Sequence, residues 1–294
     1  MIELTGLTKT FGSVKAVDQL TCVIEPGVVT GFLGPNGAGK STTMRMIVGL
    51  DRPSAGTVTV AGRPYREHKQ PLRTVGALLD ARQVHPNRTA RSHLRWIAAT
   101  NRIPERRVDE VLAEVGLSDV AGKRAGTFSL GMLQRLGIAA ALLGDPQVLL
   151  FDEPVNGLDP EGIRWIRTLM RDLAAEGRTV FVSSHLLAEM AHTADRVLVI
   201  GRGRLIAATT MAELLNHSAA VRVRSPQLDE LAALLPGARR DGAALLVDGS
   251  STEQIGDLAA AHGIVLHELT AQGTSLEEAY MNLTDAAVQY RAGT

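Results

Sequence analysis

The sequence is short of cysteine and has no excess of either charge. Its 294 residues include one cysteine, Cys22, and 31 Lys and Arg residues balance 31 Asp and Glu residues. A single cysteine excludes an internal disulfide, which fits a reducing cytoplasm, and we expect Cys22 to be a small buried apolar side chain. Zero net charge argues against a protein that coats nucleic acid through overall basicity.

Long apolar runs are also missing. No segment approaches the roughly 20 residues that a membrane-spanning helix requires. The opening "MIELTGLTKTFG" is neither a signal peptide nor an acylation motif, and we find no internal repeat and no low-complexity segment. We therefore expect a chain that does not insert into a membrane by itself, although it can still dock onto a protein that does.

Basic charge is nonetheless concentrated in one region. From Arg63 to Arg107 there are 11 Lys and Arg residues against 3 Asp and Glu, whereas the C-terminal part of the chain is acidic. One interpretation is an ordinary solvated surface. The other is a surface that faces anionic lipid headgroups or an acidic partner.

The order of strand and helix patterns predicts an α/β protein. Short strand-like runs open the chain, a helical pattern extends from about Asp80 to Leu143, and strands then alternate with helices. The continuous apolar run "QVLLFDEP" is typical of a parallel strand that is covered on both faces. We therefore predict a mainly parallel core with an inserted helical subdomain at about residues 81–145.

A second, smaller unit is expected after the core. Beyond "TTMAELLNHS" the pattern alternates three times between strand and helix, from "AVRVRS" near Ala219 to "SLEEAYMNLT". The predicted division is a larger domain at residues 1–215 and a small α+β domain at residues 216–294.

The most specific motif is a glycine-rich phosphate loop. "GPNGAGKST" matches the pattern G-x-x-x-x-G-K-[ST] from Gly34 to Ser41, between an apolar strand and a helix. Backbone N–H groups of such a loop point at phosphate oxygens, Lys40 reaches the β- and γ-phosphates, and Ser41 is a ligand for Mg²⁺. The predicted nucleotide-binding residues of this loop are Gly34, Pro35, Asn36, Gly37, Ala38, Gly39, Lys40, Ser41 and Thr42.

Polar residues end two further apolar strands. "VLLFDEP" contains Asp152, which we expect to hold Mg²⁺, and Glu153, which we expect to orient a water and accept its proton. An acidic start to a helix is the alternative, although Pro154 and a turn follow. "TVFVSSH" ends in His185, at the edge where open parallel sheets bind ligands, so this side chain is placed to hydrogen-bond the γ-phosphate or the water.

A second possible anion site begins at Thr127, in "TFSLGMLQRLGIAAALLGDP". A serine and a glycine stand where an apolar, alanine-rich helix is expected to begin, and the unpaired N–H groups of a helix start attract anions. Because the phosphate loop already provides one anion site, this segment needs another explanation.

Taken together, these motifs resemble those of the ATP-binding subunits of ABC transporters, over about Ile2 to Ala208. The resemblance implies an ABC-type P-loop NTPase core with an N-terminal antiparallel β subdomain, an ATPase activity, and Mg²⁺ as cofactor. It also implies that Phe11 stacks on adenine, that Asp159 ends the D-loop "NGLD", and that His185 is the switch histidine. The signature motif corresponds to Ser129, Leu130, Gly131 and Met132.

In this family two subunits face each other head to tail, so that each ATP lies between the phosphate loop of one subunit and the signature helix of the other. The resemblance therefore implies that Ser129 and the Gly131 N–H contact the γ-phosphate held by Lys40 of a second subunit, as in a homodimer. The helix start at Ser129 would then bind the ATP that is held by the phosphate loop of the second subunit.

The sequence departs from the family pattern in two places. Leu130 and Met132 stand where the usual signature has glycine and glutamine. Asp80 stands at the position of the Q-loop glutamine, where it is expected to meet Mg²⁺ directly or through water, and nearby Gln83 is the alternative.

These departures and the ending "SLEEAYMNLT" resemble one branch of the family, the bacitracin- and daunorubicin-type antibiotic-resistance and ABC-2-type exporters. In that branch the ATPase is a separate chain that pairs with a six-helix membrane permease. The resemblance implies an ATPase that powers export of a drug, antibiotic or lipid-like compound from the cytoplasmic side of the membrane. Its partners are then ATP, the permease and a second ATP-binding subunit, with no nucleic acid.

Three other functions are alternatives to export. Import by a related transporter stays open. Soluble ABC ATPases that act on DNA or the ribosome generally carry a long coiled coil or two fused cassettes, which this sequence lacks. A GTP switch or small-molecule kinase would leave the signature motif without a role, and the N-K-x-D motif that recognises guanine is absent.

Overall fold

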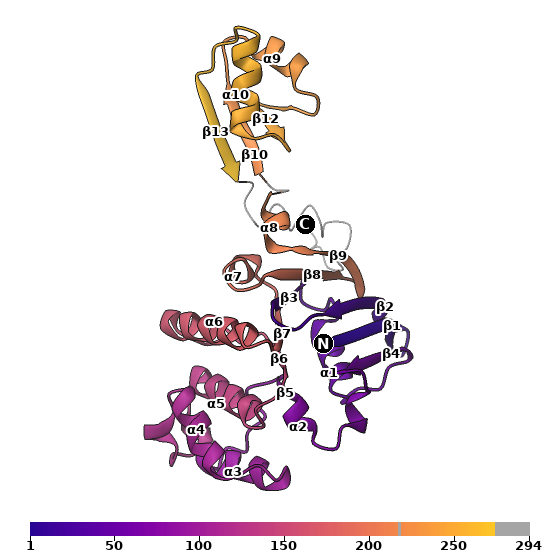
Figure 1. Cartoon of the computed structure of the whole chain (residues 1–294), viewed down its shortest axis with the longest axis vertical. Coiled ribbons are helices and arrows are strands. Elements are labelled where there is room, and N and C mark those ends of the chain that lie inside the picture. The colour runs from indigo at the N-terminus through magenta and orange to yellow at the C-terminus, as the bar shows by residue number, and fades with distance from the viewer. Residues whose placement is uncertain (217–218, 274–294) are drawn as a thin grey trace. The chain divides into compact units, whose positions relative to one another are not determined.

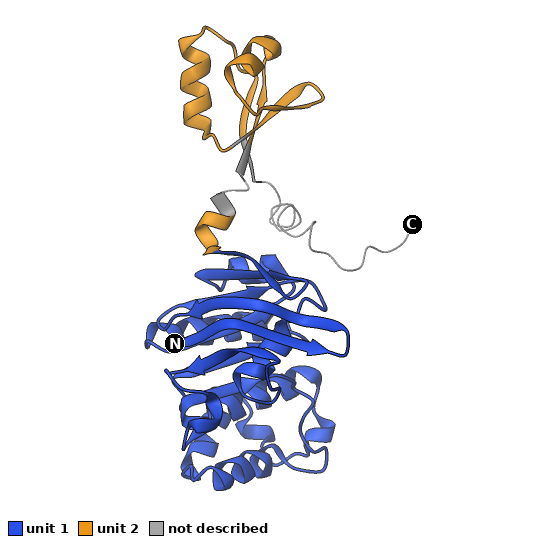
Figure 2. Ribbon diagram, turned by 90° about the vertical axis from the view of Figure 1, so that its right-hand side faces the viewer, with its two compact units in different colours: residues 1–208, 287–294 blue, residues 209–286 orange. Residues whose placement is uncertain are grey.

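A computed structural model describes residues 1–216 and 219–273 of the chain. The described residues form two compact units, residues 1–208 and a smaller unit from residue 209 onward (Figure 2). This division falls a few residues before the boundary that the sequence suggested between residues 215 and 216. The expected last helix, "SLEEAYMNLT", lies outside the described residues.

The larger unit is built on a six-stranded sheet. Its strands are β3 (Val29–Leu33), β5 (Val75–Leu78), β6 (Val148–Asp152), β7 (Thr179–Ser184), β8 (Arg196–Gly201) and β9 (Arg204–Thr210), in the order β5-β6-β7-β3-β8-β9. The neighbours from β5 to β8 pair in parallel. All residues of β3 and β7 are buried, as expected for strands covered on both faces. The predicted α/β class is confirmed.

A second, antiparallel sheet lies on one side of this core. It contains β1 (Ile2–Phe11), β2 (Val14–Ile24) and β4 (Ala55–Val60) in the order β2-β1-β4. Helix α1 (Lys40–Ile47) lies between the two sheets in Figure 1. Its Met44 and Ile47 join one apolar cluster with β1, β2 and the central strands, where Phe32 and Phe181 stack at 5.1 Å. The predicted N-terminal antiparallel subdomain is confirmed.

Helices cover the opposite face of the central sheet. Figure 1 places α5 (Leu130–Leu142), α6 (Pro160–Ala175) and α7 (Leu187–Ala191) on this face. Helices α3 (Ala90–Thr100) and α4 (Arg106–Glu114) pack with α5 into a helical subdomain. Short elements complete the unit, namely α2 (Pro71–Thr74) and 3₁₀ turns at Tyr65–Glu67, Ser118–Val120 and Ala125–Thr127. Among the described residues, we find no helix with the length and apolar character that a membrane crossing needs.

The helical pattern expected from about Asp80 begins only at Ala90. The preceding segment consists of turns, because the Asp80 carboxylate accepts a hydrogen bond from the Arg82 N–H at 2.9 Å. Thr89 then caps α3 by accepting a hydrogen bond from the Ser92 N–H at 3.1 Å. The expectation of a helix over residues 80–89 is therefore wrong, since local side-chain bonds there compete with helical ones.

The smaller unit has the order strand, helix, strand, strand, helix, strand. After α8 (Met211–Asn216) come β10 (Ala219–Arg224), α9 (Leu228–Leu234), β11 (Arg239–Asp241), β12 (Ala244–Asp248), α10 (Thr252–Ala261) and β13 (Glu268–Gly273). The sheet order is β11-β12-β10-β13, with all pairs antiparallel. This is the ferredoxin-like split βαβ arrangement. Strand β11, which the sequence pattern did not reveal, is exposed and lacks apolar alternation.

Cys22, the single cysteine, is a free, partly buried thiol on β2. Burial raises its pKa to about 12, so the reactive thiolate is scarce at neutral pH. The side chain packs against the apolar cluster between the two sheets, in agreement with the expected structural role.

Gly76 on β5 tests how closely helix α5 packs on the sheet. A Cβ atom at this position would overlap the Ala141 carbonyl oxygen and lie 2.9 Å from Pro146 Cγ. We expect Gly76→Ala to lower the free energy of unfolding by about 2–3 kcal/mol, because backbone cannot move aside cheaply. Denaturant titration measures this, with Gly122→Ala as the matched control, since nothing lies within 4 Å of a Cβ there. Equal stability of the two variants would contradict the packing.

Candidate nucleotide site

The glycine-rich loop joins β3 to α1 and depends on its glycines. A Cβ at Gly34 would lie 2.5 Å from the Ile200 carbonyl oxygen, and one at Gly39 would overlap the Ala16 carbonyl oxygen. Gly37 and Gly39 also have φ angles of 80° and 106°, which L-residues rarely adopt. The loop therefore curls into a turn whose backbone N–H groups are available to an anion at the start of α1.

Lys40 is held inside this turn. Its side chain is 6% exposed, and Nζ donates hydrogen bonds to the carbonyl oxygens of Gly34 at 2.6 Å and Pro35 at 3.3 Å. Nζ also lies 3.6 Å from Glu153 Oε1. Burial lowers the pKa of Lys40, while the Glu153 and Asp152 carboxylates act in the opposite direction. A cationic group is thus preorganised in the loop, with a carboxylate beside it.

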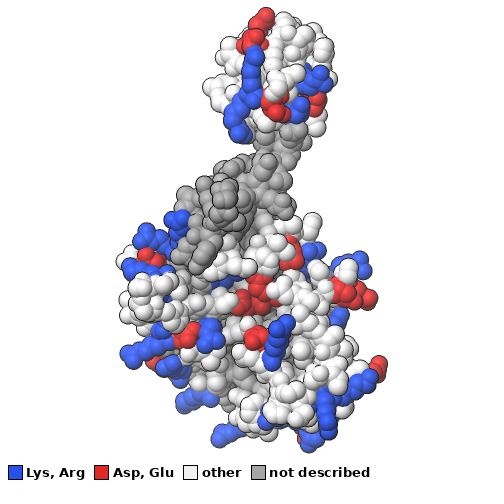
Figure 3. Space-filling view, turned by 180° about the vertical axis from the view of Figure 1, so that it is seen from behind, with Lys and Arg blue, Asp and Glu red and all other residues white. Residues whose placement is uncertain are grey.

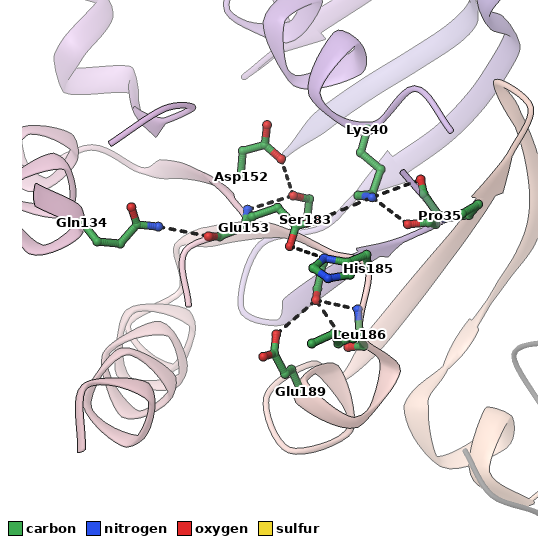
Figure 4. A network of polar contacts seen from close by, with 11 residues as sticks. Pro35, Lys40, Gln134, Asp152, Glu153, Ser183, His185, Leu186 and Glu189 are labelled. Carbon is green, nitrogen blue, oxygen red and sulfur yellow. Dashed lines mark hydrogen bonds and ion pairs between the residues drawn. The ribbon is translucent and has the colours of Figure 1, made fainter. Parts of the chain in front are cut away.

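Asp152 and Glu153 stand at the end of β6 and are tied to β7 (Figure 4). The Ser183 hydroxyl donates to Asp152 Oδ1 and accepts from the Glu153 N–H at 3.0 Å. His185 Nδ1 lies 2.8 Å from Glu153 Oε2. Both oxygens of the Glu153 carboxylate therefore have partners, Lys40 on one side and His185 on the other.

These side chains surround two neighbouring cavities. The first, of ≈ 210 Å³, is lined by Ala16, Glu153 and the loop residues from Asn36 to Thr42. The second, of ≈ 280 Å³, is lined by Leu79, Asp80, Ala81, Arg82, Leu130, Gln134, Asp152, Glu153 and Asn156. Glu153 lines both cavities. It therefore lies between the phosphate loop, which lines the first cavity, and the start of α5, which lines the second.

The alternative of an acidic helix start at Asp152 and Glu153 does not fit the structure. The next helix, α6, begins at Pro160, and residues 153–157 form a turn in which Glu153 has φ 49°. Asp159, the last residue of the expected D-loop, caps α6 by accepting a hydrogen bond from the Gly162 N–H at 2.8 Å.

The signature segment forms the start of helix α5. Ser129 caps this helix, because its Oγ accepts a hydrogen bond from the Met132 N–H at 3.2 Å. The Leu130 side chain is 37% exposed and lies over Gly157, where an added Cβ would come within 2.5 Å of it. Gly131 faces the Gly157 carbonyl, so the signature segment and the D-loop segment touch within one chain.

The remaining predicted residues are spread around this centre. Phe11 ends β1 with half of its side chain exposed, and Lys9 Nζ lies 4.8 Å from its ring centre. Asp80 and Gln83 line a groove of ≈ 390 Å³ that also includes His93 and Trp96 of α3. Phe11, Ser129 and Asp159 lie outside both cavity linings, although all three belong to the described part of the chain.

Comparisons with known proteins agree with this geometry. Residues 17–156 match the family model described as ABC transporter, and residues 219–277 match a domain of unknown function, DUF8746. The bacitracin transport ATP-binding protein BcrA of Bacillus licheniformis is 44% identical over 209 residues, which cover 70% of this chain and 68% of that protein. The chain belongs to the ABC transporter family.

Other members of the family support the assignment. The lantibiotic transport ATP-binding protein SrtF of Streptococcus pyogenes is 34% identical over 70% of this chain and 89% of its own length. A solved ATP-binding subunit of an ABC transporter is 27% identical, with a TM-score of 0.67 over 73% of this chain and 91% of that one. A dimeric bacterial ABC transporter cassette is 25% identical, with a TM-score of 0.66 over 72% and 99%. The resemblance inferred from the motifs is confirmed, and the ABC subunit is a nucleotide-binding ATPase.

The donors available for Mg²⁺ in this ABC subunit are oxygens. Ser41 is exposed on the first turn of α1, and Asp152 has one carboxylate oxygen bound to Ser183. Within residues 1–216 and 219–273, no group of three or more His, Cys, Asp or Glu side chains is arranged to hold a metal ion. This donor set fits Mg²⁺, which proteins commonly hold through one or two side chains together with phosphates and waters.

Two polar residues at the centre of the site were not found from the sequence. Ser183 links Asp152 to Glu153, and Gln134 donates from Nε2 to the Glu153 carbonyl oxygen at 3.0 Å. Both residues are buried, Ser183 in an apolar strand and Gln134 in an apolar helix. The signal that could have found them is a polar residue inside an apolar run, because a buried polar group needs a hydrogen-bond partner.

Proposed function

We propose that this ABC subunit uses ATP to drive export of an antibiotic, drug or lipid-like compound through a separate membrane permease of the ABC-2 type. The observation that carries the proposal is the 44% identity to the bacitracin transport ATP-binding protein over 209 residues. The relative that transports a lantibiotic supports the same substrate class. Relatives of this kind do not favour a soluble ATPase that acts on DNA or the ribosome.

For hydrolysis, we assign roles to residues in and around the two cavities. Phe11 stacks on adenine, the loop from Gly34 to Thr42 binds the phosphates, and Lys40 contacts the β- and γ-phosphates. Ser41 and Asp152 would hold Mg²⁺, which when bound offsets phosphate charge. Asp80 would meet the ion directly or through water, with Gln83 as the alternative. Glu153 orients the attacking water and accepts its proton, and His185, 2.8 Å from Glu153, hydrogen-bonds the γ-phosphate or that water.

Lys40 must change partners when ATP binds. Its Nζ is bound to the Gly34 and Pro35 carbonyl oxygens and lies near Glu153. Phosphate oxygens carry more charge than these carbonyls and therefore attract the ammonium group. The exchange also releases Glu153 Oε1 for the attacking water.

We further propose that two copies of the chain bind ATP between them in a head-to-tail dimer. The support is the exposed start of α5, where Ser129 and the N–H groups of the first turn are available to an anion. Ser129 and the Gly131 N–H then contact the γ-phosphate held by the second copy, while Leu130 and Met132 pack around it. Loss of that phosphate on hydrolysis removes the contact between the two copies, which then separate as rigid bodies.

We propose that the permease docks on the side of the helical subdomain, which places the subunit at the cytoplasmic face of the membrane. The groove lined by Asp80, Gln83, His93 and Trp96 opens there. Lys and Arg side chains lie along the lower margin of the larger unit in Figure 3. Part of this charge is already paired, since Arg91 pairs with Asp109 and Arg95 with Glu105. Arg91 and Arg95 are therefore less available to an anionic partner than the unpaired basic side chains of this region.

The proposal is tested by capturing the partner. A tagged Glu153→Gln chain, incubated with ATP and detergent-solubilised native membranes, is expected to retain a polytopic protein of about six spans in stoichiometric amount, identified by mass. A solute-binding protein in the same complex would indicate import instead. Recovery of ribosomal proteins or DNA, with no membrane partner, would refute the transporter role and leave the ATPase intact.

A further inference from the structure

Glu153 has a backbone conformation that a non-glycine residue adopts only under constraint. Its φ angle is 49°, in the left-handed region, directly after strand β6 ends at Asp152. Such a conformation costs on the order of 1 kcal/mol or more and persists where the surroundings over-determine it. The bend turns the Glu153 carboxylate toward Lys40 and His185 (Figure 4).

Two side chains from different elements hold the backbone of Glu153. The Glu153 N–H donates to Ser183 Oγ on β7, and the Glu153 carbonyl accepts from Gln134 Nε2 on α5, each at 3.0 Å. Ser183 is fully buried and Gln134 is 4% exposed, so water does not compete freely for either bond. Backbone groups of Glu153 are thus fixed to a strand of the core and to a helix of the helical subdomain.

Gln134 belongs to the same helix as the signature residues. Leu130 and Gln134 are four positions apart, hence on one face of α5, and both line the ≈ 280 Å³ cavity with Asp152 and Glu153. The neighbouring Arg135 makes different contacts, to the Val115 carbonyl oxygen and the Trp165 ring. On this face of α5, Gln134 is therefore the residue that hydrogen-bonds to the backbone of Glu153.

We propose that Gln134 is a positioning residue for ATP hydrolysis. Its amide N–H fixes the Glu153 carbonyl and thereby aims the carboxylate that accepts the proton of the attacking water. This inference rests on the proposed role of Glu153. Without the Gln134 bond, the carbonyl keeps only the longer hydrogen bond from the Asn156 N–H, at 3.3 Å, which comes from the same turn and not from α5. The strained backbone is then no longer fixed to α5 and relaxes, so the carboxylate moves relative to the phosphate loop.

Replacement of Gln134 with methionine removes the donor and nearly preserves the length of the side chain. We expect kcat for ATP hydrolysis to fall roughly 10-fold, because small displacements of a catalytic group are costly, while KM for ATP changes by less than about 2-fold. Gln134→Asn, which retracts the amide, is expected to act in the same direction and serves if the methionine variant does not fold. The control is Gln147→Met, the same substitution at an exposed glutamine between α5 and β6.

A double-mutant cycle with Glu153→Gln separates positioning from general destabilisation. If Gln134 acts through the Glu153 carboxylate, Gln134→Met causes no further loss in the Glu153→Gln background. A full additional loss there, or wild-type kcat of Gln134→Met beside an impaired Glu153→Gln, would overturn the role of Gln134 and leave the function standing. Wild-type turnover by Glu153→Gln would refute the proposed function itself.

Discussion

Glu153→Gln is expected to lower the ATP turnover number on the order of 100-fold or more and to leave ATP binding intact. The amide keeps the shape of the side chain but cannot accept the proton of the attacking water. Hydrogen bonds of Glu153 to Ser183 and Gln134 involve only its backbone, so the substitution leaves them in place. Steady-state phosphate release measures kcat, and equilibrium binding of labelled ATP measures affinity.

The same variant is expected to accumulate as an ATP-bound dimer, because the bridging phosphate is not removed. Light scattering with and without ATP reports the mass. Glu161→Gln is the matched control, since Glu161 is exposed in the first turn of α6. Turnover of Glu153→Gln at the control's rate would remove Glu153 from its assigned role, and an ATP-bound monomer would contradict the dimer.

Ser129→Arg is expected to abolish ATP hydrolysis without preventing a single chain from binding ATP. The long cation would stand at the exposed start of α5, where the proposed dimer places the ATP held by a second copy. Loss of the cap costs about 1 kcal/mol of helix stability, which is too little to unfold the unit. Ser118→Arg, at an exposed serine of the helical subdomain, controls for the new charge.

Complementation makes this prediction specific. A Lys40→Ala chain has an intact signature helix, and a Ser129→Arg chain has an intact phosphate loop. Mixing the two is expected to restore hydrolysis at one of the two composite sites per dimer, although each variant alone is inactive. Normal hydrolysis by Ser129→Arg alone would show that the helix start does not act on a second copy's ATP.

Local motifs of the site were predictable because their chemistry is local. The phosphate loop needs glycines, Lys40 and a following helix within a few residues, and Asp152 and Glu153 directly end a strand recognisable by its apolar run. The strand order β5-β6-β7-β3-β8 then brings the ends of β3, β6 and β7 together, as parallel connections require.

The predictions failed or were incomplete where side chains compete with the expected pattern. A helical pattern was expected from about Asp80, but the Asp80 side chain and Thr89 bind nearby backbone N–H groups instead. Strand β11 is three residues long and exposed, so it has no apolar alternation to detect. It is identified as a strand only by its antiparallel pairing with β12.

The sequence by itself determined the family, the ATPase activity, the phosphate loop and the residues at its strand ends. Only the tertiary structure decided how Glu153 is held. Gln134 and Ser183 are 19 and 30 residues away from Glu153 along the chain, and no local pattern links them. Their hydrogen bonds form because α5 and β7 both pack beside the turn after β6, where they bring a side-chain donor to the Glu153 carbonyl and an acceptor to its N–H.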